Sequence, residues 1–382
     1  MALTIIPSSN AIDCPDYRGG AISVYWGQKG KELYGTLKDT CDSGNYKIVI
    51  LESLLVFDDG SFDELNLADH CDGSGENPCS VLEPEIKHCQ EKGIKVLLSI
   101  GQDEKGSQTK EDSEKILARN LWDKFLSGSQ PGPLGTVALD GIDIADIADD
   151  AKLHWGKLVE AIHALQIAHQ KKIYLSASPQ CVYPDALLDQ AIKTGLLDYV
   201  WVEFYLHNPS CIDNSAEASA EDLLKAWKMW TSHVPKSSSI FLGLTADSSG
   251  ETEGFIPPEE LKEKVLPEAK KATNYGGVMI WDRAADRKSK YSQDIKNDIG
   301  NKKCKCVCVM IMHQTVSMAW DLCHSKLIKG WIMQWVSHIC LLIHIAFRLM
   351  HASRHALPSI IYVYVESISE YQSLSVCMSC MK

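Results

Sequence analysis

The sequence predicts an α/β fold, a single (β/α)8 TIM barrel with an atypical C-terminal extension. Two observations support this fold class. Eight apolar, β-rich runs recur between Ala21 and Trp281, and helix-like segments lie between them. Because parallel strands need crossover helices and eight such units close a sheet on itself, this alternation is typical of a barrel.

The expected elements alternate along the chain. The predicted strands are Ala21–Trp26, Lys47–Leu55, Lys95–Ile100, Leu139–Ile147, Lys172–Ser178, Tyr199–Tyr205, Ser239–Leu244 and Gly277–Trp281. The predicted helices are Cys79–Lys92, Thr109–Leu126, Leu153–Gln170, Asp185–Thr194, Ala220–His233 and Pro257–Ala272. The last of these opens with two prolines and two glutamates, which suit the first turn and the positive end of a helix.

The chain divides into three parts by composition. Residues 1–19 form a lead with no basic segment and no apolar run long enough for a signal peptide. Residues 20–299 form the barrel. Residues 300–382 are rich in Cys, Met and His, and we interpret them as translated non-coding sequence or a disordered extension. A helix that docks on the barrel is one alternative. A membrane span over Trp331–Met350 is another, although its Gln, Ser, two His and Arg disfavour it.

Charge and cysteine usage narrow the function classes. The net charge of −12 disfavours a nucleic-acid or an anionic-membrane partner. The 14 cysteines show no pattern of a zinc module, and we expect neither a metal nor a cofactor. Six cysteines in the barrel region suggest disulfides and an oxidising compartment.

One stretch of the fourth predicted strand, from Leu139 to Ala148, interleaves acidic residues with isoleucine. A half-buried strand does not normally carry three carboxylates, because buried charge is costly unless it is paired or used. The stretch therefore predicts a functional site at the end of this strand. A solvated acidic edge or turn is the alternative.

Several longer motifs resemble plant class III chitinases of glycoside hydrolase family 18, over residues 19 to 299. They are Ser23-Val-Tyr-Trp-Gly-Gln28, Leu65-Asn-Leu-Ala-Asp-His-Cys71, Gly93-Ile-Lys-Val-Leu-Leu-Ser-Ile-Gly101, Ser178-Pro-Gln-Cys181, Asp198-Tyr-Val-Trp-Val-Glu-Phe-Tyr205 and Tyr275-Gly-Gly-Val-Met-Ile-Trp281. The resemblance implies hydrolysis of β-1,4-linked N-acetylglucosamine polymers, with the substrate's own acetamide as the nucleophile. It also implies a secreted or vacuolar protein.

The same resemblance implies specific covalent features. Three disulfides are expected, and they pair Cys41 with Cys89, Cys71 with Cys79, and Cys181 with Cys211. Non-proline cis peptides are expected near Glu52-Ser53 and Trp281-Asp282.

The resemblance further implies a substrate site. Tyr205 matches the tyrosine that holds the substrate acetamide, Trp281 matches the floor of a sugar subsite, and Tyr25 matches the first-strand tyrosine. Glu203 replaces a usual Gln, and Ser53 stands where an aromatic residue is common. The alternative is that these side chains only fill the barrel mouth.

The fourth strand departs from the family at its catalytic end. Active members read Asp-Gly-x-Asp-x-Asp-x-Glu, in which alternate residues share one strand face and the Glu is the general acid. Here Asp143 is retained, and an insertion near Ala145 shifts the rest. We expect a β-bulge at Ile144-Ala145 that returns Asp146 to the inward face, since a charge among the outer helices would be expensive. Ala148 then stands where the acid should be.

Loss of the general acid usually removes a factor of about 10² to 10⁴ in rate. The sequence therefore favours a binding protein, for chitin or a related oligosaccharide, or an inhibitor of a microbial xylanase or amylase in plant defence. An endochitinase that uses an unexpected acid and a seed storage protein are the alternatives. We expect a monomer.

Overall fold

The structure is a computed structural model that describes residues 20–63, 65–73, 77–102, 111–145, 153–205, 220–249, 252 and 254–300, together with three later strands. The chain forms two units, of which one spans residues 16–301. The eight strands of this unit close into one parallel barrel in sequence order, with β1 next to β8, as the sequence predicts.

Each barrel strand lies at or near its predicted position. The strands are β1 (Ala21–Trp26), β2 (Ile48–Val56), β3 (Lys95–Gln102), β4 (Gly141–Ile144), β5 (Tyr174–Ala177), β6 (Tyr199–Glu203), β7 (Ser239–Thr245) and β8 (Tyr275–Trp281). β4 is shorter than its predicted range because Leu139 and Asp140 lie before the strand and residues 146–152 lie outside the described part of the chain.

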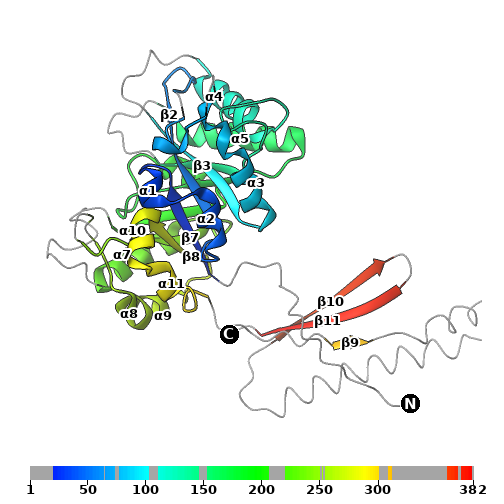
Figure 1. Ribbon diagram of the computed structural model, residues 1–382. Coiled ribbons are helices and arrows are strands. Elements are labelled where there is room, and N and C mark those ends of the chain that lie inside the picture. The colour runs from blue at the N-terminus through cyan, green and yellow to red at the C-terminus, as the bar shows by residue number, and fades with distance from the viewer. Residues whose placement is uncertain are drawn as a thin grey trace, which may run out of the picture. The chain divides into compact units, whose positions relative to one another are not determined.

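Helices surround the barrel (Figure 1). The α-helices are α1 (Lys31–Tyr34), α2 (Leu37–Asp42), α3 (Glu83–Glu91), α4 (Ser113–Leu121), α5 (Trp155–His169), α6 (Asp189–Lys193), α7 (Ala220–His233), α8 (Pro258–Glu260), α9 (Leu266–Ala269), α10 (Arg283–Ser289) and α11 (Tyr291–Ile295). Short 3-10 or π turns are η1 (Ala68–His70), η2 (Pro78–Leu82), η3 (Trp122–Leu126) and η4 (Leu261–Val265).

Four of these helices, α1, α2, α10 and α11, were not predicted. They are short, and their apolar residues do not form a long periodic pattern. Side-chain capping helps two of them to form. Thr36 and Asp39 build a capping box at the start of α2, and Asp282 Oδ1 accepts a 3.0 Å hydrogen bond from Ala285 N at the start of α10.

Apolar side chains pack on both sides of the barrel wall. The larger core lies between strands and helices, and a smaller one fills the barrel interior with Ile48, Ile50, Leu97, Trp201 and Phe241 among its members. Because side chains alternate across a strand, the positions two residues further along these strands also face the interior. This alternation places the polar side chains of the site described below.

Disulfides join segments that lie outside the barrel strands. Cys41 is bonded to Cys89, and Cys71 is bonded to Cys79, as predicted. Cys181 is also disulfide-bonded, while its predicted partner Cys211 lies outside the described residues. Both predicted non-proline cis peptides, Glu52-Ser53 and Trp281-Asp282, are present.

The C-terminal unit contains three strands that the sequence analysis did not predict. β9 (Val309–Ile311), β10 (Ser359–Ile368) and β11 (Tyr371–Cys380) form an antiparallel sheet in the order β10-β11-β9. Within the described residues no helix is long and apolar enough to span a membrane. The weak candidate span, Trp331–Met350, lies outside those residues.

Candidate functional site at the carboxyl ends of the barrel strands

The carboxylate of Asp143 is the centre of the polar groups inside the barrel mouth. Its Oδ1 accepts hydrogen bonds from Ser176 Oγ at 2.6 Å and from Trp201 Nε1 at 2.9 Å. Its Oδ2 accepts from Tyr25 Oη at 2.7 Å and from Ser99 Oγ at 3.1 Å. Asp143 has no exposed surface, so these four donors replace the water that a free carboxylate would bind.

The local sequence explains how Asp143 reaches this position. Asp143 pairs with Ser99 of β3 and with Ser176 of β5, so all three side chains occupy one level of the barrel. Gly141 makes this packing possible, since a Cβ atom there would lie 2.0 Å from Tyr174 O on the neighbouring strand. The glycine of the fourth-strand motif thus has a steric reason.

Asp143 and Tyr25 share one buried network. The Tyr25 hydroxyl contacts both Asp143 and Ser178. Burial raises the pKa of the Asp143 carboxyl, although its four hydrogen bonds oppose this rise. Burial and the charge of Asp143 raise the pKa of Tyr25 well above its usual value, so that the tyrosine stays a hydrogen-bond donor.

Aromatic rings form one wall of the mouth. Tyr205 stacks on Trp281 with their ring centroids 5.9 Å apart and an interplanar angle of 14°, and Tyr25 lies 5.3 Å from Trp281. Trp281 is half-buried, while Tyr25 and Tyr205 are buried. An aromatic ring with one accessible face can carry the apolar face of a sugar ring.

Two further carboxyls face the same interior. Glu203 is 7% exposed, and burial followed by the charges of Asp143 and Asp185 raises its pKa to about 8, against a hydrogen bond from Tyr205. Glu52 is 9% exposed, and its pKa is raised by burial and by the charges of Glu203 and Asp143. Glu203 therefore holds a proton at neutral pH, and the pKa of Glu52 is shifted in the same direction.

The structure brings together five of the seven residues that the sequence analysis assigned to the site: Asp143, Tyr25, Tyr205, Glu203 and Trp281. The other two, Asp146 and Ala148, lie outside the described residues. β4 pairs in regular register up to Ile144, and Ala145 N donates to Ile100 O at 2.9 Å, so the expected bulge would begin no earlier than Ala145.

Sequence reasoning missed the residues that support the site. Ser99, Ser176 and Trp201 hold Asp143, and Glu52 faces the interior two residues beyond Ile50. Strand alternation is the signal that could have found the three donors. Each of them lies two residues away from another inward-facing residue on the same strand, and residues two apart share one face.

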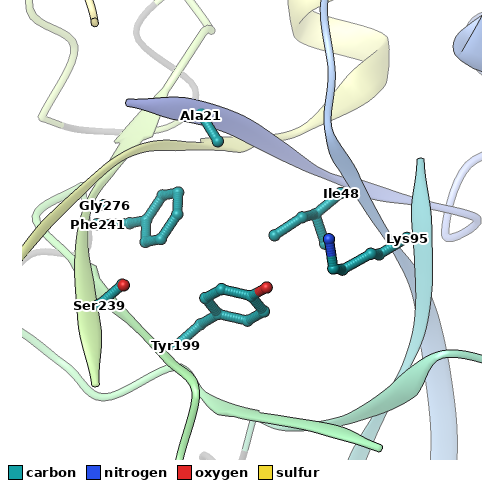
Figure 2. A pocket seen from close by; sticks show the side chains of 7 residues that line it. All are labelled: Ala21, Ile48, Lys95, Tyr199, Ser239, Phe241 and Gly276. Atoms are coloured by element: carbon teal, nitrogen blue, oxygen red, sulfur yellow. The ribbon is translucent and has the colours of Figure 1, made fainter. Parts of the chain in front are cut away.

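A separate small pocket lies at the opposite end of the barrel (Figure 2). Its lining residues are Ala21, Ile48, Lys95, Tyr199, Ser239, Phe241 and Gly276. Five of them are the first residues of β1, β2, β3, β6 and β7, which puts the pocket at the amino ends of the strands. In barrel enzymes this end serves stability, while the chemistry lies at the carboxyl ends.

Comparison with known proteins agrees with this geometry. Residues 21–254 match the model of the glycosyl hydrolases family 18. The chain belongs to this family. The family 18 match covers the strands β1 to β7 and therefore includes Tyr25, Asp143 and Glu203.

Individual members of glycosyl hydrolase family 18 are closely similar. An acidic endochitinase of Cicer arietinum is 45% identical over 299 residues, which are 77% of this chain and 94% of that protein. The crystal structure of a tamarind chitinase-like lectin superposes with a TM-score of 0.64 at 45% identity, covering 72% of this chain and 99% of the lectin. The crystal structure of a xylanase-alpha-amylase inhibitor protein in complex with trehalose superposes with a TM-score of 0.63 at 37% identity, covering 73% of this chain and 98% of the inhibitor. Family 18 relatives of this chain thus include proteins named as enzymes, a lectin and an inhibitor.

Proposed function

We propose that this family 18 protein binds chitin-type oligosaccharides in its barrel mouth and hydrolyses them slowly or not at all. The observation that carries the proposal is the contrast between an intact binding wall and the sequence at the acid position. Tyr205 stacks on Trp281 and Asp143 has all its donors, whereas the chain has Ala148 where the general acid is expected. A sugar could lie on the wall, but no carboxylic acid at that position would protonate the leaving oxygen.

The similarity to a chitinase-like lectin supports this proposal, since 45% identity is shared with a protein named for binding. An active endochitinase remains the opposite reading, which the similarity to acidic endochitinases supports. The third hypothesis, a seed storage protein without a ligand, predicts that no sugar binds in the barrel mouth.

Calorimetric titration with chitotetraose, alongside turnover of a fluorogenic chitotriose, tests the function. We expect saturable binding and turnover no faster than buffer. Trp281→Ala should weaken binding by roughly tenfold, because the sugar loses its aromatic platform. As a control, Met229→Ala removes a large, exposed apolar side chain of α7, outside the barrel, and should leave the affinity unchanged. Rapid turnover would contradict the proposal, and absence of binding would contradict it as well.

Restoring the acid should restore the chemistry. Ala148→Glu combined with deletion of Ala145 is expected to raise chitotriose turnover by about 10² or more, the usual contribution of a positioned general acid. Ala148→Gln in the same background is the control, because it has the same shape and no proton to donate. Equal rates in the two variants would mean that the mouth no longer holds a substrate productively.

A second candidate function is inhibition of a microbial glycosidase, which the 37% identity to a xylanase-alpha-amylase inhibitor favours. An inhibitor would use its outer surface. Ile167 of α5 is an apolar side chain there with 67% of its surface exposed. Residual activity of a fungal xylanase and of an α-amylase, measured with increasing protein, tests this function, and Ile167→Asp tests the surface.

We also propose that residues 20–299 are the functional domain and that the segment 300–382 is dispensable. Ile299 still belongs to the barrel, since its carbonyl accepts a 2.9 Å hydrogen bond from Tyr275 Oη, and Lys270 Nζ donates to Gly300 O at 3.0 Å. A chain that ends at Asn301 should therefore keep its melting temperature and sugar affinity. A fall of more than about 4 °C, the equivalent of roughly 1 to 2 kcal/mol for a domain of this size, would contradict this.

An extracellular or vacuolar location fits the disulfides Cys41–Cys89 and Cys71–Cys79, because such bonds persist in oxidising compartments. The partner is then a free oligosaccharide or a secreted microbial enzyme.

A further inference from the structure

The barrel mouth contains an excess of carboxyl groups. Glu52, Asp143 and Glu203 come from alternate strands, β2, β4 and β6. Glu52 follows the inward-facing Ile48 and Ile50 at the same spacing, and Glu203 follows the inward-facing Trp201. Each carboxyl raises the pKa of another through its charge, so the three share one electrostatic environment.

The three carboxyls differ in how many hydrogen bonds they accept from the described residues. Asp143 accepts four hydrogen bonds, and Glu203 has one partner in Tyr205. The carboxyl of Glu52 has no hydrogen-bond partner among the described residues, although only 9% of the residue is exposed. The Glu52 oxygens are not among the fully buried unpaired atoms of the described residues, and the side chain continues the inward-facing row of Ile48 and Ile50 toward the mouth. A ligand group in the mouth can therefore supply the donors that this carboxyl lacks.

Among the described residues, the elements around these carboxyls supply little compensating charge. β1 presents Tyr25, β3 presents the hydroxyl of Ser99, and β5 presents that of Ser176. Ser178 follows directly after β5, and Tyr205 lies two residues after the end of β6. Asp185 adds negative charge near Glu203, and Asp282 adds it near Glu52. The side chain of Lys29 is half exposed, and its Nζ lies 3.5 Å from Asp282 Oδ2. The positive charge of Lys29 is therefore compensated by Asp282.

We propose that the mouth recognises an amino sugar with a free, cationic 2-amino group, so that the preferred ligand is a deacetylated glucosamine oligosaccharide. This inference rests on the proposed binding function. The sugar ring lies on Trp281, and its ammonium group lies against Glu52 and Glu203. An ammonium group offers three donors and a charge, whereas an acetamide offers one N–H and no charge. Charge-assisted hydrogen bonds are the stronger ones, and here they form in a water-poor interior.

Proton release accompanies this binding. In the free protein Glu203 holds a proton at neutral pH, because its pKa is raised to about 8. When the ammonium group arrives, the carboxyl ionises, and its proton leaves to the solvent. A neutral, acetylated sugar causes no such ionisation.

Calorimetric titration of the full chain at pH 7 with glucosamine tetramer and with N-acetylglucosamine tetramer tests the inference. The deacetylated tetramer should bind at least tenfold more tightly. Its binding heat should change between two buffers of different ionisation enthalpy, which reports the released proton, while the heat of the acetylated tetramer should not change.

Glu52→Gln and Glu203→Gln are each expected to abolish most of the tenfold preference, since the amide keeps the shape of the side chain but cannot ionise. Glu91→Gln is the matched control: it removes one charge from the exposed end of α3 and should keep the preference. A preference that survives in the double variant Glu52→Gln/Glu203→Gln would come from the overall charge of −12 and would overturn the inference.

The outcomes separate the two proposals. Failure of both tetramers to bind overturns the proposed function. Binding of the acetylated tetramer with equal or higher affinity than the deacetylated one keeps the binding function and overturns the amino-sugar inference alone.

Discussion

Asp143→Ala is expected to lower the free energy of unfolding by about 3 to 5 kcal/mol. The substitution removes the acceptor for four donors, Tyr25, Ser99, Ser176 and Trp201, in a place without exposed surface. Each donor that stays buried without a partner costs about 1 to 3 kcal/mol, partly recovered if water enters the cavity. Urea denaturation at pH 7, with the disulfides intact, measures the change.

Two further variants serve as comparisons for Asp143→Ala. Asp143→Asn keeps the shape and one acceptor oxygen, so it should cost less than the alanine variant. Asp123→Ala removes an exposed carboxylate outside the barrel and should change stability by no more than about 0.5 kcal/mol. A loss below about 1 kcal/mol for Asp143→Ala would show that the carboxylate does not hold the network together. In that case the role of Asp143 could not be to position the Tyr25 hydroxyl.

Glu203→Gln is expected to stabilise the protein at alkaline pH and to have little effect at acidic pH. The pKa of Glu203 rises from 4.5 to about 8 on folding, so the folded protein binds this proton more tightly than the unfolded chain. Stability that depends on the proton is fully present below pH 4.5 and is lost as the pH rises through about 8. At about 1.4 kcal/mol for each pKa unit, the buried charge costs roughly 3 to 5 kcal/mol above that pH. The amide has no charge to bury.

Urea denaturation of the wild type and the variant at pH 5 and pH 9 measures this difference. The variant should be more stable by several kcal/mol at pH 9, and within about 1 kcal/mol of the wild type at pH 5. Glu91→Gln, on the surface, should shift stability equally at both pH values. If Glu203→Gln changes the free energy of unfolding equally at pH 5 and pH 9, Glu203 is already ionised in the folded protein at both pH values. Glu203 would then have no proton to release when an ammonium group binds.

These expectations describe a site whose parts have separate roles. Asp143 is too well buried to contact a sugar, and it orients the Tyr25 hydroxyl. Trp281 and Tyr205 form the surface on which a sugar would lie. Glu203 carries the proton that we propose a ligand replaces, and Glu52 shares its electrostatic surroundings. A mouth of this kind can select a ligand by charge even when it lacks a general acid.

Much of the candidate site could be predicted from the sequence. Tyr25, Asp143, Glu203, Tyr205 and Trp281 stand in motifs that are local in the chain, and the alternation of strand residues assigns them to one face. Glu52 was missed as a site residue, although it lies two residues beyond the inward-facing Ile50. The irregularity of β2 between Leu51 and Leu54 affects the residues that come after it, because a single inserted residue changes which side chains face inward.

The sequence by itself determined the barrel, because eight apolar runs separated by helices admit few other ways to bury both faces of a parallel sheet. It also determined the disulfide pairs Cys41–Cys89 and Cys71–Cys79 through their resemblance to family motifs. Only the tertiary structure decided which donors hold Asp143 and which carboxyls share its surroundings. Tyr25 is 118 residues from Asp143 in the chain, and Trp201 is 58 residues away. Their contacts arise from the closure of the sheet, and the pKa of a buried carboxyl depends on every charge that this closure brings near it.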